Sequence, residues 1–110
     1  MKFLVMSTVK DTFSMVPLAI KRQFMEAGVA WMDEQKKKGK LLEAYQTPDK
    51  STVAICEVAS IEDGIQMEAT NPMSGFMDNK VYPLADFNKS MQAYIGACKQ
   101  AEKLFPSASK

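Results

Sequence analysis

A carboxylate inside an apolar strand is the residue in this sequence best suited to chemistry. Glu57 lies in a stretch that otherwise reads Val53, Ala54, Ile55, Cys56 and Val58. A carboxylate in such surroundings loses hydration, which raises its pKa toward neutrality, as a general base for a carbon acid requires. We predict Glu57 as a catalytic base. The alternative is an ordinary solvated residue at the end of its strand.

A second carboxylate interrupts an apolar stretch in the same way. Glu43 stands among Leu41, Leu42 and Ala44. Two carboxylates in one cavity hold their pKa values apart and so provide an acid and a base from identical groups. This pairing requires a strand register that places Glu43 and Glu57 on one face of the sheet, and a slip of one residue would separate them.

Three further polar side chains alternate with apolar neighbours and are candidates for substrate binding. Tyr45 and Tyr82 could each line a pocket with the ring and direct a hydroxyl at a carbonyl oxygen, or they could simply pack on the sheet with the hydroxyl at its edge. Lys80 could attract a substrate carboxylate, although a lone lysine on an edge strand also serves to discourage aggregation.

The composition excludes several classes of site. The 110 residues include no histidine, which removes Ser-His-Asp and Cys-His nucleophile systems, histidine-ligated metals and haem held by a proximal histidine. The five glycines stand apart, so there is no glycine-rich phosphate loop. We therefore expect no metal and no cofactor, and any chemistry must use carboxylates, Lys, Tyr, Cys or backbone groups.

Charge and hydropathy limit the partners. The 14 basic and 13 acidic side chains leave a net charge of +1, which argues against nucleic acid as the main partner. No apolar run approaches the ~20 residues that span a bilayer. Cys56 and Cys98 are expected to be free thiols in a reducing compartment. These features predict a cytoplasmic protein with no membrane partner.

Hydrophobic spacing predicts four strands and three helices in one domain, residues 1–105, followed by a flexible tail at 106–110. The first strand, Phe3 to Val9, is apolar at odd and even positions, as in a central strand buried on both faces. A helix capped by Ser14 then runs to about Lys38, with the apolar stripe Val16, Ile20, Phe24, Ala27 and Trp31. Two strands, Leu41 to Thr47 and Thr52 to Val58, form a hairpin through Pro48 to Ser51.

The second half repeats the pattern of a helix followed by a strand. Ser60 caps a short helix whose inner face is predicted to be Ile61, Ile65 and Ala69, closed by Asn71 and Pro72. The fourth strand is expected at about Met77 to Tyr82. Asp86 caps a last helix that Pro106 stops, with the stripe Phe87, Met91, Tyr94, Ile95, Cys98 and Leu104.

This order of elements, βαββαβ with an extra C-terminal helix, predicts a ferredoxin-like α+β fold. Helices would cover one face of a four-stranded sheet. The other face is also apolar and cannot remain in water, so a second copy packed sheet to sheet is the simplest cover. We therefore predict a homodimer.

Several stretches of the sequence resemble muconolactone isomerases. They are the opening Met1, Phe3, Val5, Thr8, Val9, Lys10, Met15 and Pro17; then Glu57, Val58, Ser60 and Glu62; and then Pro72, Phe76, Met77, Asp78, Val81 and Leu84. The resemblance covers roughly residues 1 to 84. In the strand Leu41 to Thr47 the sequence differs, because Leu42, Glu43 and Tyr45 stand where the isomerases have basic and imidazole side chains.

The resemblance implies a dimeric α+β barrel, which can assemble further into a decamer, with a small pocket in each protomer. It implies a cofactor-independent isomerase that moves a proton from carbon to carbon in a small unsaturated lactone or related ring compound, bound between the sheet and its helices. Glu57 or Glu43 would move the proton, and Tyr45 and Tyr82 would orient the carbonyl. Two alternatives remain, a small monooxygenase of the same fold without metal or flavin, and a non-catalytic module for ligand binding or assembly.

Overall fold

The computed structural model describes residues 1–106 and contains four strands and three α-helices. The elements are β1 (Lys2–Val9), α1 (Leu18–Lys37), β2 (Leu41–Gln46), β3 (Thr52–Glu57), α2 (Ile61–Ala69), β4 (Met77–Leu84) and α3 (Phe87–Leu104). Short 3-10 turns occupy Asp11–Met15 and Ser74–Phe76. The predicted order of strands and helices is confirmed.

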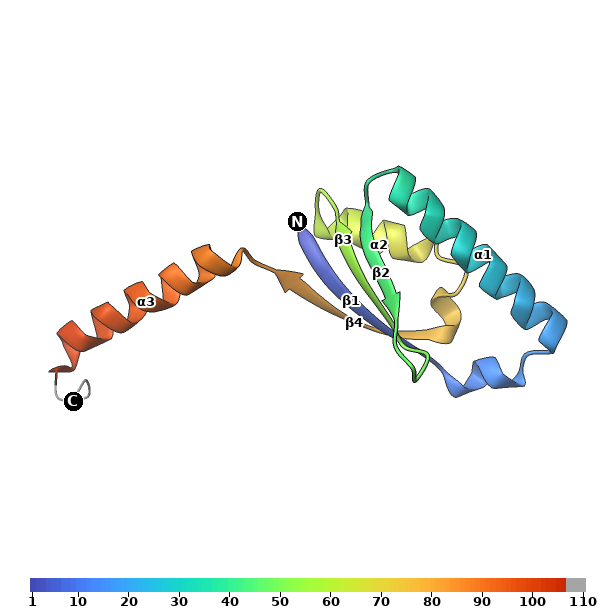
Figure 1. Ribbon diagram of the computed structural model, residues 1–110, viewed down its shortest axis with the longest axis horizontal. Coiled ribbons are helices and arrows are strands. Elements are labelled where there is room, and N and C mark those ends of the chain that lie inside the picture. The colour runs from blue at the N-terminus through green and yellow to red at the C-terminus, as the bar shows by residue number, and fades with distance from the viewer. Residues whose placement is uncertain (107–110) are drawn as a thin grey trace.

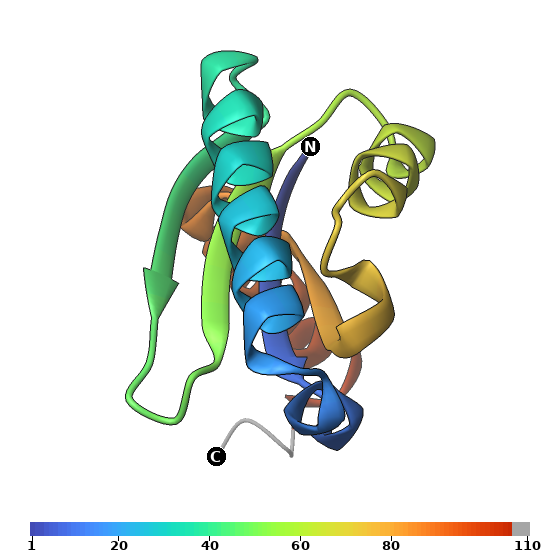
Figure 2. The same cartoon turned by 90° about the vertical axis from the view of Figure 1, so that its right-hand side faces the viewer.

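The four strands form one antiparallel sheet in the order β2-β3-β1-β4. Helices α1 and α2 lie together on one face of this sheet (Figures 1 and 2). Val5 lies opposite Ala54 and Val81 in the register, and these three residues face the helices. Leu4 lies opposite Ile55 and Tyr82, on the other face, which we call the outer face. The chain is therefore an α+β protein with the ferredoxin-like fold, and β1 is central as predicted.

Helix termini follow the capping residues that the sequence provides. The Ser60 Oγ accepts a hydrogen bond of 3.2 Å from the Asp63 amide, and Asp86 accepts one of 2.9 Å from the Lys89 amide. Gly39 has a φ of +73°, a conformation that other residues rarely adopt, and it turns the chain from α1 into β2. These three boundaries agree with the sequence.

The start of α1 differs from the prediction. Ser14 does not cap a helix, since its hydroxyl donates a hydrogen bond of 2.6 Å to the Asp11 carbonyl inside the 3-10 turn. Val16 is extended, as expected of a residue that precedes proline, and α1 begins only after Pro17. The proline therefore ends one short helix and begins the next.

The buried core lies between β2, β3 and α2. It consists of Leu41, Ala54, Cys56, Val58 and Met67, with Phe3, Val5, Trp31, Met32 and Ala44 packed against it. Phe13 and Phe24 contact Phe76 with ring centroids 5.0 and 5.1 Å from it. No large side chain among the described residues is fully buried. The core is small for a chain of this length.

The predicted helix stripes are correct only in part. In α1, Phe24 and Trp31 are half-buried, but Ile20 is 44% exposed. In α2, Ile61 and Ile65 are more than half exposed and Met67 is the buried residue. A Cβ at Gly28 of α1 would meet the Met73 side chain at 3.2 Å, so α1 lies close to the segment that follows α2.

Large apolar side chains remain uncovered within a single chain. On the outer face, Met6 is 41% and Tyr82 is 46% exposed, so β1 is not buried on both faces as predicted. Helix α3 does not return to the body of the protein but projects away from the end of β4 (Figure 1). Its predicted stripe is therefore exposed too. The predicted tail lies outside the described residues, apart from Pro106.

Candidate functional site

A cavity of about 1240 Å³ lies between the sheet and the helices α1 and α2. Its floor is the helix-facing side of the sheet, with Val5, Ala54 and Val81 among the lining residues. Val29 of α1 and Ile65 of α2 also line it, and both are more than 60% exposed, so the cavity opens to solvent between these helices. The walls are mainly apolar, as in most sites for small organic molecules.

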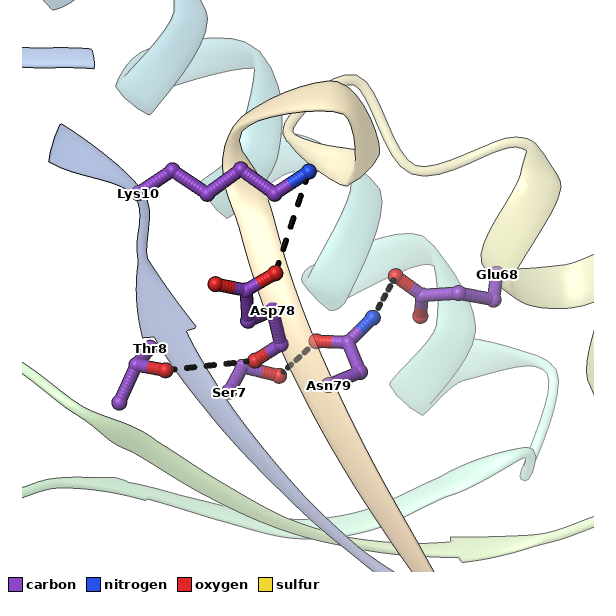
Figure 3. A network of polar contacts seen from close by, with 6 residues as sticks. All are labelled: Ser7, Thr8, Lys10, Glu68, Asp78 and Asn79. Atoms are coloured by element: carbon purple, nitrogen blue, oxygen red, sulfur yellow. Dashed lines mark hydrogen bonds and ion pairs between the residues drawn. The ribbon is translucent and has the colours of Figure 1, made fainter. Parts of the chain in front are cut away.

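One half-buried carboxylate, that of Glu68 on α2, lies in the wall of this cavity. Its Oε1 accepts a hydrogen bond of 2.9 Å from Nδ2 of Asn79 on β4 and a longer one of 3.5 Å from Nδ2 of Asn71. Asn79 in turn accepts a hydrogen bond of 2.6 Å from the Ser7 hydroxyl on β1. Figure 3 shows this chain of contacts running from the sheet to α2. The contacts fix the position of the carboxylate.

Burial raises the proton affinity of the Glu68 carboxylate. Loss of hydration raises the pKa of its carboxyl, and the hydrogen bonds from Asn79 and Asn71 oppose part of that rise. Burial, together with the negative charge of Glu68, also raises the pKa of the neighbouring Cys56 thiol. The thiol is therefore kept protonated, and a role for it as a nucleophile is disfavoured.

The raised pKa of Glu68 predicts a distinct pH dependence of stability. The folded protein retains the Glu68 proton at a pH where the unfolded chain has lost it, so this residue's contribution to stability falls as pH rises through the folded-state pKa. We expect Glu68→Gln to melt at a higher temperature than the unsubstituted protein at pH 7. The difference should disappear below the ordinary glutamate pKa of about 4.3. Thermal melts of both proteins from pH 3.5 to 8 measure it, and a difference that grows toward acid pH would contradict the assignment.

Three lysines, Lys10, Lys21 and Lys50, line the same cavity. Lys21 of α1 lies over the Phe13 ring, with its Nζ 5.5 Å from the ring centroid. Lys10 follows β1, and its Nζ is 3.9 Å from an oxygen of Asp78, as Figure 3 also shows. Both cations are available to an anionic oxygen in the cavity. The site thus combines the half-buried Glu68 carboxylate and the exposed Asp11 with lysine cations and a largely apolar wall.

The two carboxylates predicted from the sequence do not line this cavity. The strand pairing places Glu43 opposite Ile55 after a β-bulge, so Glu43 and Glu57 share the outer face, at diagonal positions. One oxygen of Glu57 lies 3.6 Å from the Met1 ammonium group, and the other is buried without a hydrogen-bond partner. Their predicted position in a pocket between sheet and helices is wrong, because Cys56 occupies that side of β3. A chemical role for them on the outer face stays a prediction.

The register places all three predicted binding residues on the outer face of the sheet. Tyr82 and Lys80 lie opposite Leu4 and Met6 of β1. Tyr45 lies opposite Val53 on the edge strand β2, where it also borders the cavity, and its hydroxyl donates a hydrogen bond of 3.1 Å to Glu43. That hydrogen bond and the Glu43 charge raise the pKa of Tyr45. No predicted residue reaches Glu68.

The sequence contained a signal for Glu68 that a different choice of helix face would have found. Ile61, Ile65 and Glu68 follow the spacing i, i+4, i+7, which places them on one side of a helix. The spacing that continues instead to Ala69 is equally regular, and the apolar residue is the more obvious choice for an inner face. The position of Asn79 was also predictable, since residues 77, 79 and 81 are two apart and so share one face of β4 with the apolar Met77 and Val81.

Across residues 1–106, no three His, Cys, Asp or Glu side chains are grouped so as to hold a metal ion. In the same range, every helix is too short or too polar to cross a bilayer.

Comparisons with known proteins support the fold. No protein-family model matches the sequence, and no curated protein is significantly similar to it. Muconolactone isomerase has a similar structure, with a TM-score of 0.71 and 22% identity over 78% of this chain and 90% of that one. The 5-chloro-2-hydroxyhydroquinone dehydrochlorinase of Burkholderia phenoliruptrix, solved with 2,5-dihydroxybenzoquinone, has a TM-score of 0.62 and 16% identity over 81% of this chain and 98% of that one. The chain therefore shares its ferredoxin-like fold with both of these structures.

Proposed function

We propose that the protein is a cofactor-independent isomerase of a small unsaturated lactone or related ring compound, with Glu68 as the group that moves the proton. The observation that carries this proposal is a half-buried carboxylate with a raised pKa in the wall of a mainly apolar cavity. A raised pKa makes a carboxylate a stronger base, which favours removal of a proton from carbon. The two enzymes of similar structure act, by their names, on a lactone and on a hydroquinone, which fits the same class of ring compound.

In the proposed reaction, the Glu68 carboxylate removes a proton from the ring carbon next to the double bond. The electrons of the broken C–H bond move into the conjugated system and place negative charge on the carbonyl oxygen. The protonated Glu68, whose proton can exchange with solvent, then delivers a proton to the far end of that system, so the double bond has moved and no redox partner is needed. Asn79 holds the carboxylate in position through its hydrogen bond.

The cations at the cavity wall support the second requirement of this reaction, stabilisation of the oxygen that becomes negative. Lys21 and Lys10 both line the cavity and carry positive charge into a site of low polarity. An ammonium group in such a site interacts with an oxyanion more strongly than it would in water. We assign them to the carbonyl or carboxylate oxygens of the substrate.

Hydrogen exchange tests the proposal directly. The protein is incubated in D₂O with unsaturated five-membered lactones, and deuterium incorporation at ring carbons is followed by NMR. We expect incorporation together with migration of the double bond, because a proton held on Glu68 exchanges with solvent. Oxygen uptake with an electron-rich phenol and no lactone exchange would replace the proposal with a monooxygenase. Ligand binding without exchange would replace it with a binding module.

The proposal includes a homodimer formed through the outer face. Leu4, Val53 and Ile55 form an apolar strip across β1 and β3, with Met6 and Tyr82 beside it. Burial of such a strip against its own copy removes apolar area from water on both chains. The lone Lys80 lies beside this strip on the edge strand β4, as is common where strand-to-strand aggregation is avoided.

A further inference from the structure

Helix α3 carries one apolar face that no other part of residues 1–106 covers. Phe87, Met91, Tyr94 and Cys98 follow spacings of four, three and four residues, so they share one side of the helix, and Ile95 lies beside them. Phe87 is 75% and Tyr94 is 70% exposed. The opposite side is formed by polar residues and a glycine, namely Lys89, Gln92, Gly96, Gln100 and Lys103. This two-sided pattern is typical of a helix that packs against another protein surface.

The direction of α3 prevents that surface from being its own sheet. Only Ala85 and Asp86 separate the end of β4 from the start of α3, and Asp86 is extended, with φ −61° and ψ 129°. The helix therefore leaves the body of the protein, which gives the chain a length of 66 Å (Figure 1). The radius of gyration is 19.6 Å, whereas a compact domain of this length has about 13 Å.

The exposed area identifies the kind of partner. A compact monomer of 12.3 kDa exposes about 6100 Å². This chain exposes 8331 Å². The excess exceeds the roughly 800 Å² per partner of an ordinary interface and lies in the range of obligate homodimers. An excess of this size requires a partner that is always present when the chain is made, and a second copy of the same chain meets that condition.

We propose that α3 is an exchanged arm, which packs its Phe87 to Cys98 face on a second copy of this chain. Two-fold symmetry then closes the assembly, because each copy receives the arm that the other extends. The α3 face and the outer face of the sheet are both apolar surfaces that residues 1–106 leave uncovered. A symmetric pair covers both of them, whereas a single unrelated partner on the arm would leave the sheet uncovered. This inference is independent of the reaction assigned to the cavity.

A pair of matched double variants tests the proposal. Met91→Glu with Tyr94→Glu places two carboxylates on the apolar face, and Gln92→Glu with Gln100→Glu places the same two charges on the opposite side of the helix. All four positions are exposed in a single chain, so neither variant disturbs a buried site. Sedimentation and light scattering over a range of concentrations measure the mass of each protein. Circular dichroism verifies that each retains its helices.

We expect the unsubstituted protein and the control pair to be dimers or multiples of dimers. The Met91 and Tyr94 pair should dissociate at a concentration at least about 100-fold higher, since two charges would have to be buried in the interface. Equal dissociation of both variants would overturn the proposal, because assembly would then depend on the sheet alone. A monomeric unsubstituted protein would also overturn the proposal. This holds whether X-ray scattering gives a radius of gyration near 13 Å, with α3 folded onto its own chain, or near 19.6 Å, with α3 extended.

Discussion

Glu68→Gln should lower the turnover of the lactone substrate by about 10²- to 10⁴-fold, the usual contribution of a general base. The amide keeps the shape of the side chain and can still accept a hydrogen bond from Asn79, but it cannot take up a proton. The Michaelis constant should change little, because the cavity walls and the two lysines are unaltered. Initial rates and deuterium exchange at pH 7 measure both quantities.

Two other glutamines serve as controls for that experiment. Glu62 lies in the first turn of the same helix, is exposed and does not line the cavity, so Glu62→Gln should retain full turnover. Glu57→Gln distinguishes the two faces of the sheet, since Glu57 is on the outer face. If Glu57→Gln abolished turnover while Glu68→Gln retained it, the cavity would not be the active site. The prediction of Glu57 as the catalytic base would then be correct.

Leu41→Ala should lower the free energy of unfolding by about 2 to 5 kcal/mol, the range observed when a buried leucine is truncated. Leu41 begins β2 with 4% of its surface exposed, and it packs in the small cluster with Ala54, Cys56, Val58 and Met67. Leu41→Ala would leave a cavity, and the cluster has no large, fully buried side chain that could shift to fill it. A loss of this size is a large fraction of the stability of a domain of this length.

The next residue along the chain is the matched control. Leu42 is 44% exposed and lies at the β-bulge, so Leu42→Ala removes the same atoms from a site that is much less buried. Its loss should be clearly smaller. Urea denaturation of both variants at one fixed protein concentration measures the difference, since dimer stability depends on concentration. Equal losses would show that the burial of Leu41 in one chain is not what stabilises the fold.

The fold was predictable because several independent signals agreed. Gly39 ended α1, the side chains of Ser60 and Asp86 capped the next two helices, and alternating residues defined the strands. The first residue of α1 was harder to predict, because Ser14 is a good capping residue. Only the restricted backbone of Val16, which precedes Pro17, delays the start of the helix to Leu18. The residue types near Ser14 are compatible with a helix that begins there or after Pro17, and the conformation of Val16 before the proline favours the later start.

The candidate site was harder to predict, because its residues depend on which face of each strand packs toward the helices. Glu43 and Glu57 were chosen for their apolar neighbours, but a strand alternates its faces, and Cys56 took the side toward the cavity. Glu68 has two hydrogen-bond partners, and one of them, Asn79, is eleven positions away on β4. Local sequence does not contain that contact. It arises only when α2 packs against the sheet.

The carboxylate of the site and one wall of the cavity belong to the same short helix. A ligand that is too wide would push α2 outward and let water reach Glu68. The carboxyl would then regain its hydration and release its proton more readily, so the base would be weakest for the ligands that fit worst. The site would then select ligands by size through the basicity of Glu68, and no residue would need to block the entrance.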